Sequence, residues 1–406
     1  MSLHTDKSKQ PLRKLWGLSS EIAYLNHGSF GATPLAVLEH QHSIQRQMER
    51  EPVQFMLRDV PEGLWESQKA LAEFVHAQPQ DIVLMDNATT AVNTVFASLC
   101  LNPGDEILFV DQVYGACRKT AEFYAKRWGA ICRIISLPSG LTDSDEITQL
   151  ILKAWSPKTK LLLLDHICSP TGWVLPIEEV VETYERKGVR VLVDGAHALG
   201  QIPLDLDALG ASYYVANAHK WLCTPKGSAL LHVRKNRQQE IRPLVFSHWM
   251  DWENTTGHVR YSPFQMAFAW NGTRDVSALL SIPFTLEWMS NLHTEGWGGL
   301  QKENTNRAKV WRRRLSKILD EPLLCPDSMV GHMGSVLLPQ NIRIPHNSNI
   351  PVGQKLSPIW DFLYKEHQIE VVVFPAEDRQ ILRFSIETYV TDTDMNRLVD
   401  ALGTLL

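Results

Sequence analysis

The 406-residue chain lacks a Cys-x-x-Cys motif, and its six cysteines are scattered, which fits reduced thiols better than a disulfide framework or a zinc site. It also lacks an apolar run of the roughly 20 residues that a membrane-spanning helix needs. Its first 20 residues hold no apolar segment typical of a secretory signal. The net charge is −5 and no basic stripe is present. We therefore expect a cytoplasmic protein that binds neither membrane nor nucleic acid.

Seven short apolar runs dominate the middle of the chain and predict strands. They are nearly continuous rather than alternating, as expected for strands covered on both faces. The runs lie at 81–85, 105–110, 130–137, 160–165, 189–194, 212–217 and 228–233. Helical patterns lie between several of them, at 89–100, 115–128, 144–154 and 176–187. This alternation predicts an α/β fold with a mainly parallel seven-stranded sheet, in which the short loop between the last two runs allows antiparallel pairing.

The remaining chain predicts a second, smaller domain. Residues 235–285 are rich in loops, and a long helix is expected at about 299–319. Strands are expected near 334–338, 369–374 and 381–386, and helices near 357–366 and 393–404. We predict an N-terminal tail at 1–20, a large domain at 21–285 and an α+β C-terminal domain at 286–406.

Polar residues follow six of the apolar runs, at the strand ends where open α/β sheets bind ligands. Asp194 ends one buried strand, and a buried carboxylate needs a cationic or donor partner. Lys220 lies between two apolar strands, where it can reach the surface or be desolvated into a nucleophilic amine. Thr89 lies at the start of a helix, where the side chains can cap the free N–H groups or join them in binding an anion. Pyridoxal phosphate unites the three features, because its ring nitrogen, aldehyde and phosphate call for these partners.

The motif "VDGAHALGQIPLDLDALGASYYVANAHKWLCTPKGSALL" resembles the class V aminotransferase group of fold type I pyridoxal phosphate enzymes. More narrowly, "LNHGSFGATP", "EPVQFMLRDVP", "DHICSPTGWVLP" and "WNGTRD" are similar to isopenicillin N epimerase-like proteins. The similarity covers about residues 20–280 well and the C-terminal domain weakly. The motif is specific for the cofactor and much less specific for the reaction.

The resemblance implies cofactor-binding roles. Lys220 would carry the aldehyde, Asp194 would pair with the ring nitrogen, and Tyr114 would stack on the ring. His197 and Ser169 would lie near the ring hydroxyl, and the phosphate would be held by Ala88, Thr89, Asn217 and His219. Thr273 would reach the phosphate of the neighbouring subunit, which implies a homodimer.

The resemblance also implies substrate-binding and catalytic roles. Arg383 would hold the carboxylate of an amino-acid-type substrate, although it can also be an ordinary arginine on a strand. Asn26 and His27 would line the substrate pocket, as would Arg58, which can equally form a structural ion pair. Lys220 would remove the α-proton, and Tyr114 and His27 are candidates for a second acid.

The resemblance favours an epimerase or racemase. Alternatives are a C–S lyase similar to hercynylcysteine sulfoxide lyase, a class V aminotransferase, and a non-catalytic relative of the fold. A desulfurase of this group needs a cysteine shortly before its carboxylate-binding arginine, and no cysteine lies between Cys325 and Arg383. No GxGxxG follows an early strand, which disfavours a nicotinamide-binding fold.

Overall fold

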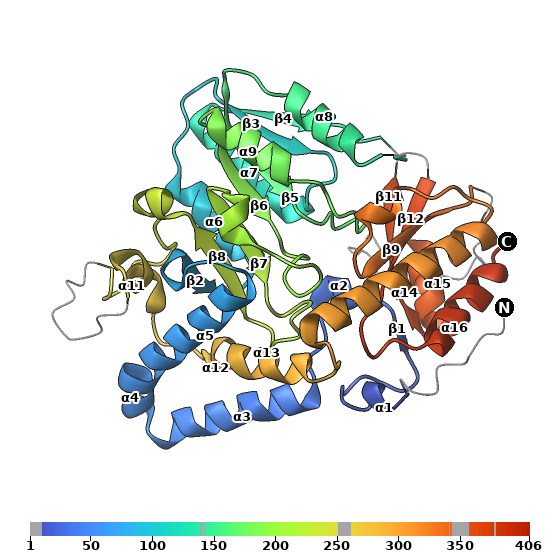
Figure 1. Cartoon of the computed structure of the whole chain (residues 1–406), viewed down its shortest axis with the longest axis horizontal. Helices are drawn as coiled ribbons and strands as arrows, with labels where there is room; N and C mark the ends of the chain where they lie inside the picture. The colour runs from blue at the N-terminus through green and yellow to red at the C-terminus, as the bar shows by residue number, and fades with distance from the viewer. Residues whose placement is uncertain are drawn as a thin grey trace.

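A computed structural model describes residues 10–138, 140, 141, 143–250, 261–340, 342, 357–376 and 379–406. Its centre is a seven-stranded sheet (Figure 1) with the order β2-β8-β7-β6-β5-β3-β4. The strands are β2 (Ile82–Met85), β3 (Glu106–Val110), β4 (Ile131–Ile135), β5 (Thr159–Asp165), β6 (Arg190–Asp194), β7 (Tyr213–Asn217) and β8 (Ala229–Val233). Each coincides with a predicted run, so the seven-stranded sheet is confirmed.

Strand direction in the sheet agrees with the prediction of a mainly parallel arrangement. β7, β6, β5, β3 and β4 run parallel to one another. β8 is antiparallel to both β7 and β2, as the short loop after β7 allows. The carboxyl ends of the parallel strands therefore meet at one edge of the sheet, where ligands bind in such folds.

Helices cover both faces of the sheet, so its strands are buried on both sides. Leu161 and Leu163 belong to one buried cluster, and Leu162 and Leu164 belong to another, because successive strand residues point to opposite faces. The first cluster includes α6 (Ala88–Ser98) and α7 (Gly115–Trp128), and the second includes α5 (Val60–Phe74), α8 (Asp145–Lys153) and α9 (Glu178–Arg186). This double burial explains the continuous apolar runs.

A three-stranded antiparallel sheet forms the core of the C-terminal part, in the order β11-β12-β9. Its elements confirm the predicted helices and strands: α14 (Gly296–Ile318), β9 (Met333–Leu338), α15 (Pro358–His367), β10 (Ile369–Glu370), β11 (Val372–Ala376), β12 (Arg379–Ser385) and α16 (Asp392–Gly403). β1 (Ala23–Tyr24) pairs in parallel with β10. The division at 285/286 stays a prediction, and this pairing joins the start of the predicted large domain to the C-terminal part.

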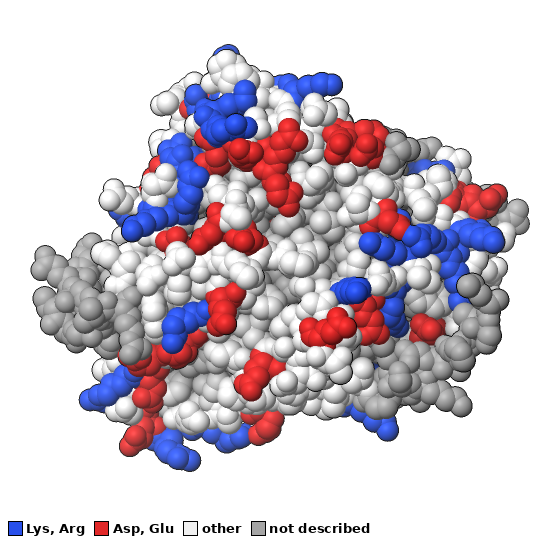
Figure 2. Space-filling view, in the orientation of Figure 1, with Lys and Arg blue, Asp and Glu red and all other residues white. Residues whose placement is uncertain are grey.

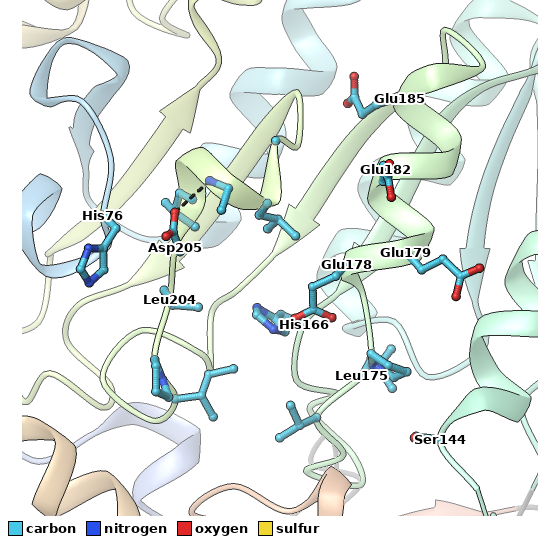
Figure 3. A pocket seen from close by; sticks show the side chains of 18 of the residues that line it. His76, Ser144, His166, Leu175, Glu178, Glu179, Glu182, Glu185, Leu204 and Asp205 are labelled. Atoms are coloured by element: carbon cyan, nitrogen blue, oxygen red, sulfur yellow. Dashed lines mark hydrogen bonds between the residues drawn. The ribbon is translucent and has the colours of Figure 1, made fainter.

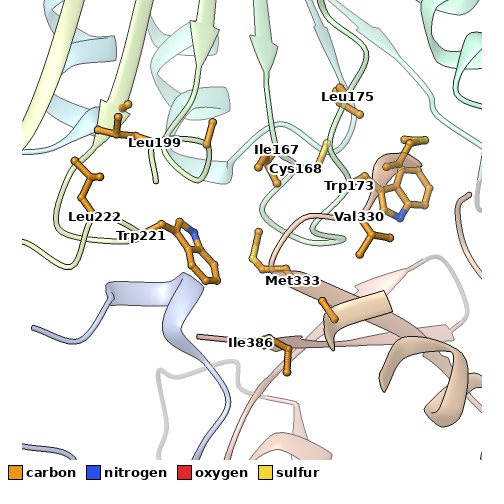
Figure 4. Packing of buried hydrophobic residues seen from close by; sticks show 14 of the residues in the cluster. Ile167, Cys168, Trp173, Leu175, Leu199, Trp221, Leu222, Val330, Met333 and Ile386 are labelled. Carbon is orange, nitrogen blue, oxygen red and sulfur yellow. The ribbon is translucent and has the colours of Figure 1, made fainter. Parts of the chain in front are cut away.

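The two parts pack tightly where the loops after the large sheet meet the start of β9. Figure 4 shows Trp221, Met333 and Ile386 in this contact, all buried. Gly172 has a left-handed backbone conformation with φ +70°, and a Cβ there would lie 2.8 Å from Met333 Cβ. Only glycine allows so close an approach. The contact holds β12, the neighbour of β9, beside the strand ends.

The other elements lie mainly around the large sheet: α1 (Gln10–Arg13), α2 (His27–Phe30), α3 (Leu35–Arg50), α4 (Pro52–Gln54), η1 (Phe55–Asp59), η2 (Pro79–Asp81), α10 (Leu206–Leu209), η3 (Lys235–Glu240), α11 (Pro263–Ala269), α12 (Ser277–Leu280), α13 (Ile282–Ser290) and η4 (Asp327–Met329). No helix in the described ranges has the length and hydropathy of a membrane span. Acidic and basic side chains are interspersed on the face in Figure 2.

Candidate active site

A cavity of about 150 Å³ lies at the carboxyl ends of the parallel strands. All residues predicted to hold the cofactor line it except Thr273. The lining consists of Ser29, Phe30, Asn87, Ala88, Thr89, Tyr114, Asp165, Ile167, Ser169, Asp194, Ala196, His197, Asn217, His219 and Lys220. The fold thus gathers side chains from across more than a hundred residues of sequence into one small space.

Asp194 and Lys220 lie at the centre of this cavity. Asp194 Oδ1 accepts a hydrogen bond from the Ala196 N–H at 3.0 Å, and Oδ2 accepts one from the Cys117 thiol at 3.2 Å. Lys220 Nζ lies 3.3 Å from His197 Nε2. Desolvation lowers the pKa of Lys220 to about 8, against the opposing effect of Asp194. A minor but appreciable fraction of Lys220 is therefore a neutral, nucleophilic amine near neutral pH.

The start of α6 provides an anion-binding end to the cavity. Asn87 caps the helix by accepting the Thr90 N–H at 2.8 Å, and Asn217 Oδ1 accepts the Ala88 N–H at 2.8 Å. In the described part of the chain the Thr89 N–H has no protein acceptor. His219 is held through Nδ1 by the Ser228 carbonyl at 3.0 Å. A free helix N–H with hydroxyl and imidazole groups nearby fits a phosphate.

Arg383, on β12, contacts Ser29 and Ser169, which line the cavity. Its Nη1 donates to the Ser169 carbonyl, and its Nη2 lies 3.4 Å from Asn26 Oδ1 and 3.4 Å from Ser29 Oγ. Arg383 is 1% exposed, and its Nε has no acceptor within the described ranges. Burial lowers its pKa to about 10. No carboxylate pairs with this buried cation in the described structure, so its environment suits an anionic ligand group.

His27 does not line the cavity of its own chain, and its predicted role as an acid and substrate-contacting residue stays a prediction. Its Nε2 lies 2.9 Å from the Lys220 carbonyl, and its Nδ1 lies 3.0 Å from Tyr389 Oη. Because a carbonyl only accepts, Nε2 must donate and Nδ1 must accept from Tyr389. Burial lowers the pKa of His27 to about 3, which keeps it neutral. Nε2 holds the Lys220 carbonyl and Nδ1 is held by Tyr389, so the geometry favours a positioning role.

We expect His27→Leu to lower kcat and to destabilise the protein by about 1–3 kcal/mol, because a buried carbonyl and a buried hydroxyl lose their partner. His27→Gln keeps a donor near the Nε2 position and should recover much of the lost activity. Thermal unfolding and steady-state kinetics of both variants check this expectation. Equal losses in the two variants would show that the hydrogen bond to Lys220 is unimportant.

Two further predicted residues lie outside the cavity. Arg58 is exposed in η1 and donates to Gln54 Oε1 at 2.7 Å. It does not line the cavity of its own chain, and its predicted place in the substrate pocket stays a prediction. Thr273 is exposed beside Arg274, which pairs with Asp86 next to α6. Its predicted role in a neighbouring subunit stays a prediction.

Two residues of the site were missed by the sequence analysis as functional residues. Asp165 is buried and lines the cavity, and Cys117 donates to Asp194 from the first turns of α7. Asp165 ends β5 as Asp194 ends β6, so the repeated strand–aspartate pattern was an available signal. Nothing in the sequence marks Cys117, because its partner lies on a distant strand.

A larger cavity of about 1080 Å³ lies beside α9, away from Lys220. Figure 3 shows His166, Glu178 and Asp205 around it. Further glutamates of α9 line the same space: Glu179, Glu182 and Glu185. This acidic lining disfavours a phosphate-bearing cofactor, so the small cavity is the better candidate despite its size.

Comparison with known proteins agrees with this geometry. A family model described as "Aminotransferase class-V" matches residues 34–329. Isopenicillin N epimerase of Streptomyces clavuligerus is 31% identical over 96% of both chains. A probable chloroplastic L-cysteine desulfhydrase of Arabidopsis thaliana is 29% identical over 95% of this chain and 83% of its own.

Solved structures show the same fold. The cystine C–S lyase C-DES, in complex with its reaction product cysteine persulfide, matches with a TM-score of 0.80 at 22% identity. The match covers 95% of this chain and 98% of that one. Together with the Asp194, Lys220 and α6 arrangement, the family match leads to one conclusion. The chain belongs to the class V aminotransferase family and is a pyridoxal phosphate-dependent enzyme of fold type I.

Proposed function

We propose that this enzyme removes the α-proton of an amino-acid-type substrate and returns a proton to the opposite face, as an epimerase. The observation that carries the proposal is the presence of two proton carriers, Lys220 and Tyr114, in one cavity. Arg383 lies behind that cavity as a buried cation without a carboxylate partner in the described ranges. Similarity to two isopenicillin N epimerases, each 31% identical over nearly the whole chain, supports the reaction type.

The residues around the cavity suit pyridoxal phosphate, with Lys220 at the aldehyde, Asp194 at the ring nitrogen and the α6 start at the phosphate. When bound, the cofactor supplies an electron sink that stabilises negative charge on the substrate α-carbon. Lys220 accepts the α-proton, because its lowered pKa keeps the amine partly neutral. Burial raises the pKa of Tyr114, so its hydroxyl stays protonated and can donate. His197 and Ser169 complete the proposed ring contacts.

Arg383 is proposed to bind the substrate carboxylate and thereby orient the α-carbon. Its neighbours Asn26, Ser29 and Ser169 offer only uncharged oxygens. A carboxylate would supply the missing charge and a bidentate acceptor. Asn26 is itself held by Glu370 at 3.1 Å, so it fixes the arginine rather than moving with it.

We expect Arg383→Gln to raise KM by about 10²-fold or more, because a charged hydrogen-bonding partner of the substrate is lost. Arg383→Lys should recover little, since an ammonium cannot form the planar two-point contact. Steady-state kinetics with the active substrate measure the effect. Arg379→Gln is the matched control, because Arg379 lies on the same strand and pairs with Glu321. A similar KM change in both variants would contradict the assignment.

A C–S lyase acting on cysteine or a related thio-amino acid is the second candidate. Full-length similarity to plant L-cysteine desulfhydrases favours it, and such a reaction begins with the same proton removal. A route through a protein persulfide is disfavoured, because Cys325 is buried and its sulfur lies 3.0 Å from Arg312 Nη1. Burial also raises the pKa of Cys325 to about 11, which leaves the thiol unreactive.

Incubation with amino acids in deuterated water distinguishes the reactions. Epimerisation predicts α-deuteration together with loss of chirality and no keto acid. Release of sulfide with pyruvate from cysteine would favour the lyase, and keto acid with retained chirality would favour transamination. Lys220→Ala is the control in each assay, and deuteration that persists in it would rule out Lys220 as the base.

We also propose that the enzyme is a homodimer in which Thr273 serves the other copy. The exposure of Thr273 and its absence from its own cavity support this arrangement. Arg274 would help to place the loop through its ion pair with Asp86. Analytical ultracentrifugation of the purified protein tests the oligomeric state.

A further inference from the structure

Asp165 is a second buried carboxylate beside Asp194. The two residues pair directly across the neighbouring parallel strands β5 and β6. Paired positions in adjacent strands point to the same side of a sheet. Both residues line the same cavity, and they are 2% and 3% exposed. The site therefore presents two carboxyl groups where a ring nitrogen needs one.

The protein neutralises neither group fully. Asp165 Oδ1 accepts the Tyr114 N–H at 3.4 Å, and its Oδ2 is buried with no acceptor or donor partner in the described ranges. Asp194 accepts hydrogen bonds from the Ala196 N–H and the Cys117 thiol. No ion pair holds either carboxylate among the described residues. The titratable groups around the pair are Tyr114 just before α7, Cys117 on α7, Cys168 after β5, His197 after β6, Tyr214 on β7, Lys220 after β7, and Arg383 on β12.

Burial and mutual repulsion disfavour two full charges on this pair in the cofactor-free protein. Burial raises the pKa of both carboxyls, and the charge of Asp194 raises that of Asp165 further. Two carboxylates in one low-dielectric site titrate as a pair that keeps one proton to higher pH. Lys220 cannot balance two negative charges, since its own pKa is lowered to about 8.

We propose that Asp165 and Asp194 hold one proton between them and deliver it to the pyridine nitrogen of the cofactor when the cofactor binds. The O–H bond of the carboxyl pair breaks and an N–H bond forms on the ring nitrogen. The pair then carries two negative charges instead of one, and the ring nitrogen becomes positive. This inference rests on the proposed placement of the ring nitrogen at Asp194. It makes Asp165 the residue that keeps the nitrogen protonated without a proton from solvent.

Proton counting on cofactor binding tests this inference directly. The cofactor-stripped full-length chain is titrated with pyridoxal phosphate in a calorimeter, at one pH, in buffers of different ionisation enthalpy. In Asp165→Asn no shared proton exists, so the variant should take up about one more proton per site than the wild type. Asp143→Asn is the matched control, because Asp143 is an exposed carboxylate that does not line this cavity and, within the described ranges, accepts only the Asp145 N–H at 3.1 Å. Its proton count should equal that of the wild type.

The pH dependence of stability provides a second measurement on the cofactor-free protein. Asp165 has a folded-state pKa above its unfolded value of about 3.9, so its contribution to stability falls as pH rises through the folded pKa. The asparagine of Asp165→Asn does not titrate, so the variant does not lose stability in this way as pH rises. The melting temperature of the variant relative to the wild type should therefore rise as pH rises above the unfolded value of about 4.

Equal proton counts, or a melting-temperature difference that stays constant with pH, would overturn the inference. Those outcomes leave the proposed function intact as long as borohydride still labels Lys220 in the wild type. A wild-type protein in which Lys220 cannot be labelled would instead overturn the proposed function itself.

Discussion

Lys220→Ala should reduce turnover by about 10⁴-fold or more, the largest effect expected of any single substitution in this chain. The change removes both the amine that attaches the cofactor and the base that takes the α-proton. Lys220 lies in the cavity with Asp194, and the protein lowers its pKa to about 8. No other lysine of the described structure lines this cavity. Nothing nearby can therefore replace it.

Borohydride reduction of the cofactor-loaded wild type, followed by peptide mapping, checks the attachment point. The adduct should lie on Lys220 and not on Lys226, which lies in the same loop and donates to the Gly31 carbonyl at 3.1 Å. The rate of attachment should rise with pH up to about 8 and then level, because only the neutral amine attacks the aldehyde. A rate that keeps rising to pH 10 would contradict the lowered pKa.

Asp194→Ala should lower kcat by about 10²–10⁴-fold, the second largest effect. Removing one partner of a buried charged pair costs about 3–5 kcal/mol, and about 1.4 kcal/mol corresponds to a tenfold change in rate. The cofactor should still attach, since Lys220 is unchanged. Carbanion stabilisation should be weakened, because the ring nitrogen loses its anionic partner.

Comparison of Asp194→Ala with Asp194→Asn separates charge from shape. Asparagine keeps the acceptor for the Ala196 N–H but removes the charge, so it should be impaired nearly as much as alanine. Single-turnover kinetics and α-deuteration measure the chemical step, and borohydride labelling confirms attachment. An Asp194→Asn variant with wild-type kcat would contradict the proposed role.

The sequence predicted the large sheet closely because its strands are buried on both faces. Leu161 to Leu164 are all apolar, since alternate residues pack on opposite helix layers. The polar residues were thereby confined to strand ends, where they were easy to see. The pairing of β1 with β10 was not predictable, because two-residue strands leave no periodic signal.

Several residues that the sequence analysis placed in the site lie together in the structure, while their roles stay predictions. Asp194, Lys220, His219 and Thr89 all line one cavity, as expected. His27 and Arg58 do not line this cavity, because a motif identifies a residue without saying which way it faces. His27 turns its ring to the Lys220 carbonyl, and Arg58 turns to Gln54.

By itself, the sequence determined the sheet, the family and the residues able to hold an aldehyde cofactor, because residue type and local pattern carry that information. Only the tertiary structure decided which ionisable groups lie together in one buried cavity. Asp165 and Asp194 are 29 positions apart in the chain and paired across two strands. Their mutual effect on proton binding depends on that register and on burial. Both arise from packing across the whole fold, which no local stretch of sequence contains.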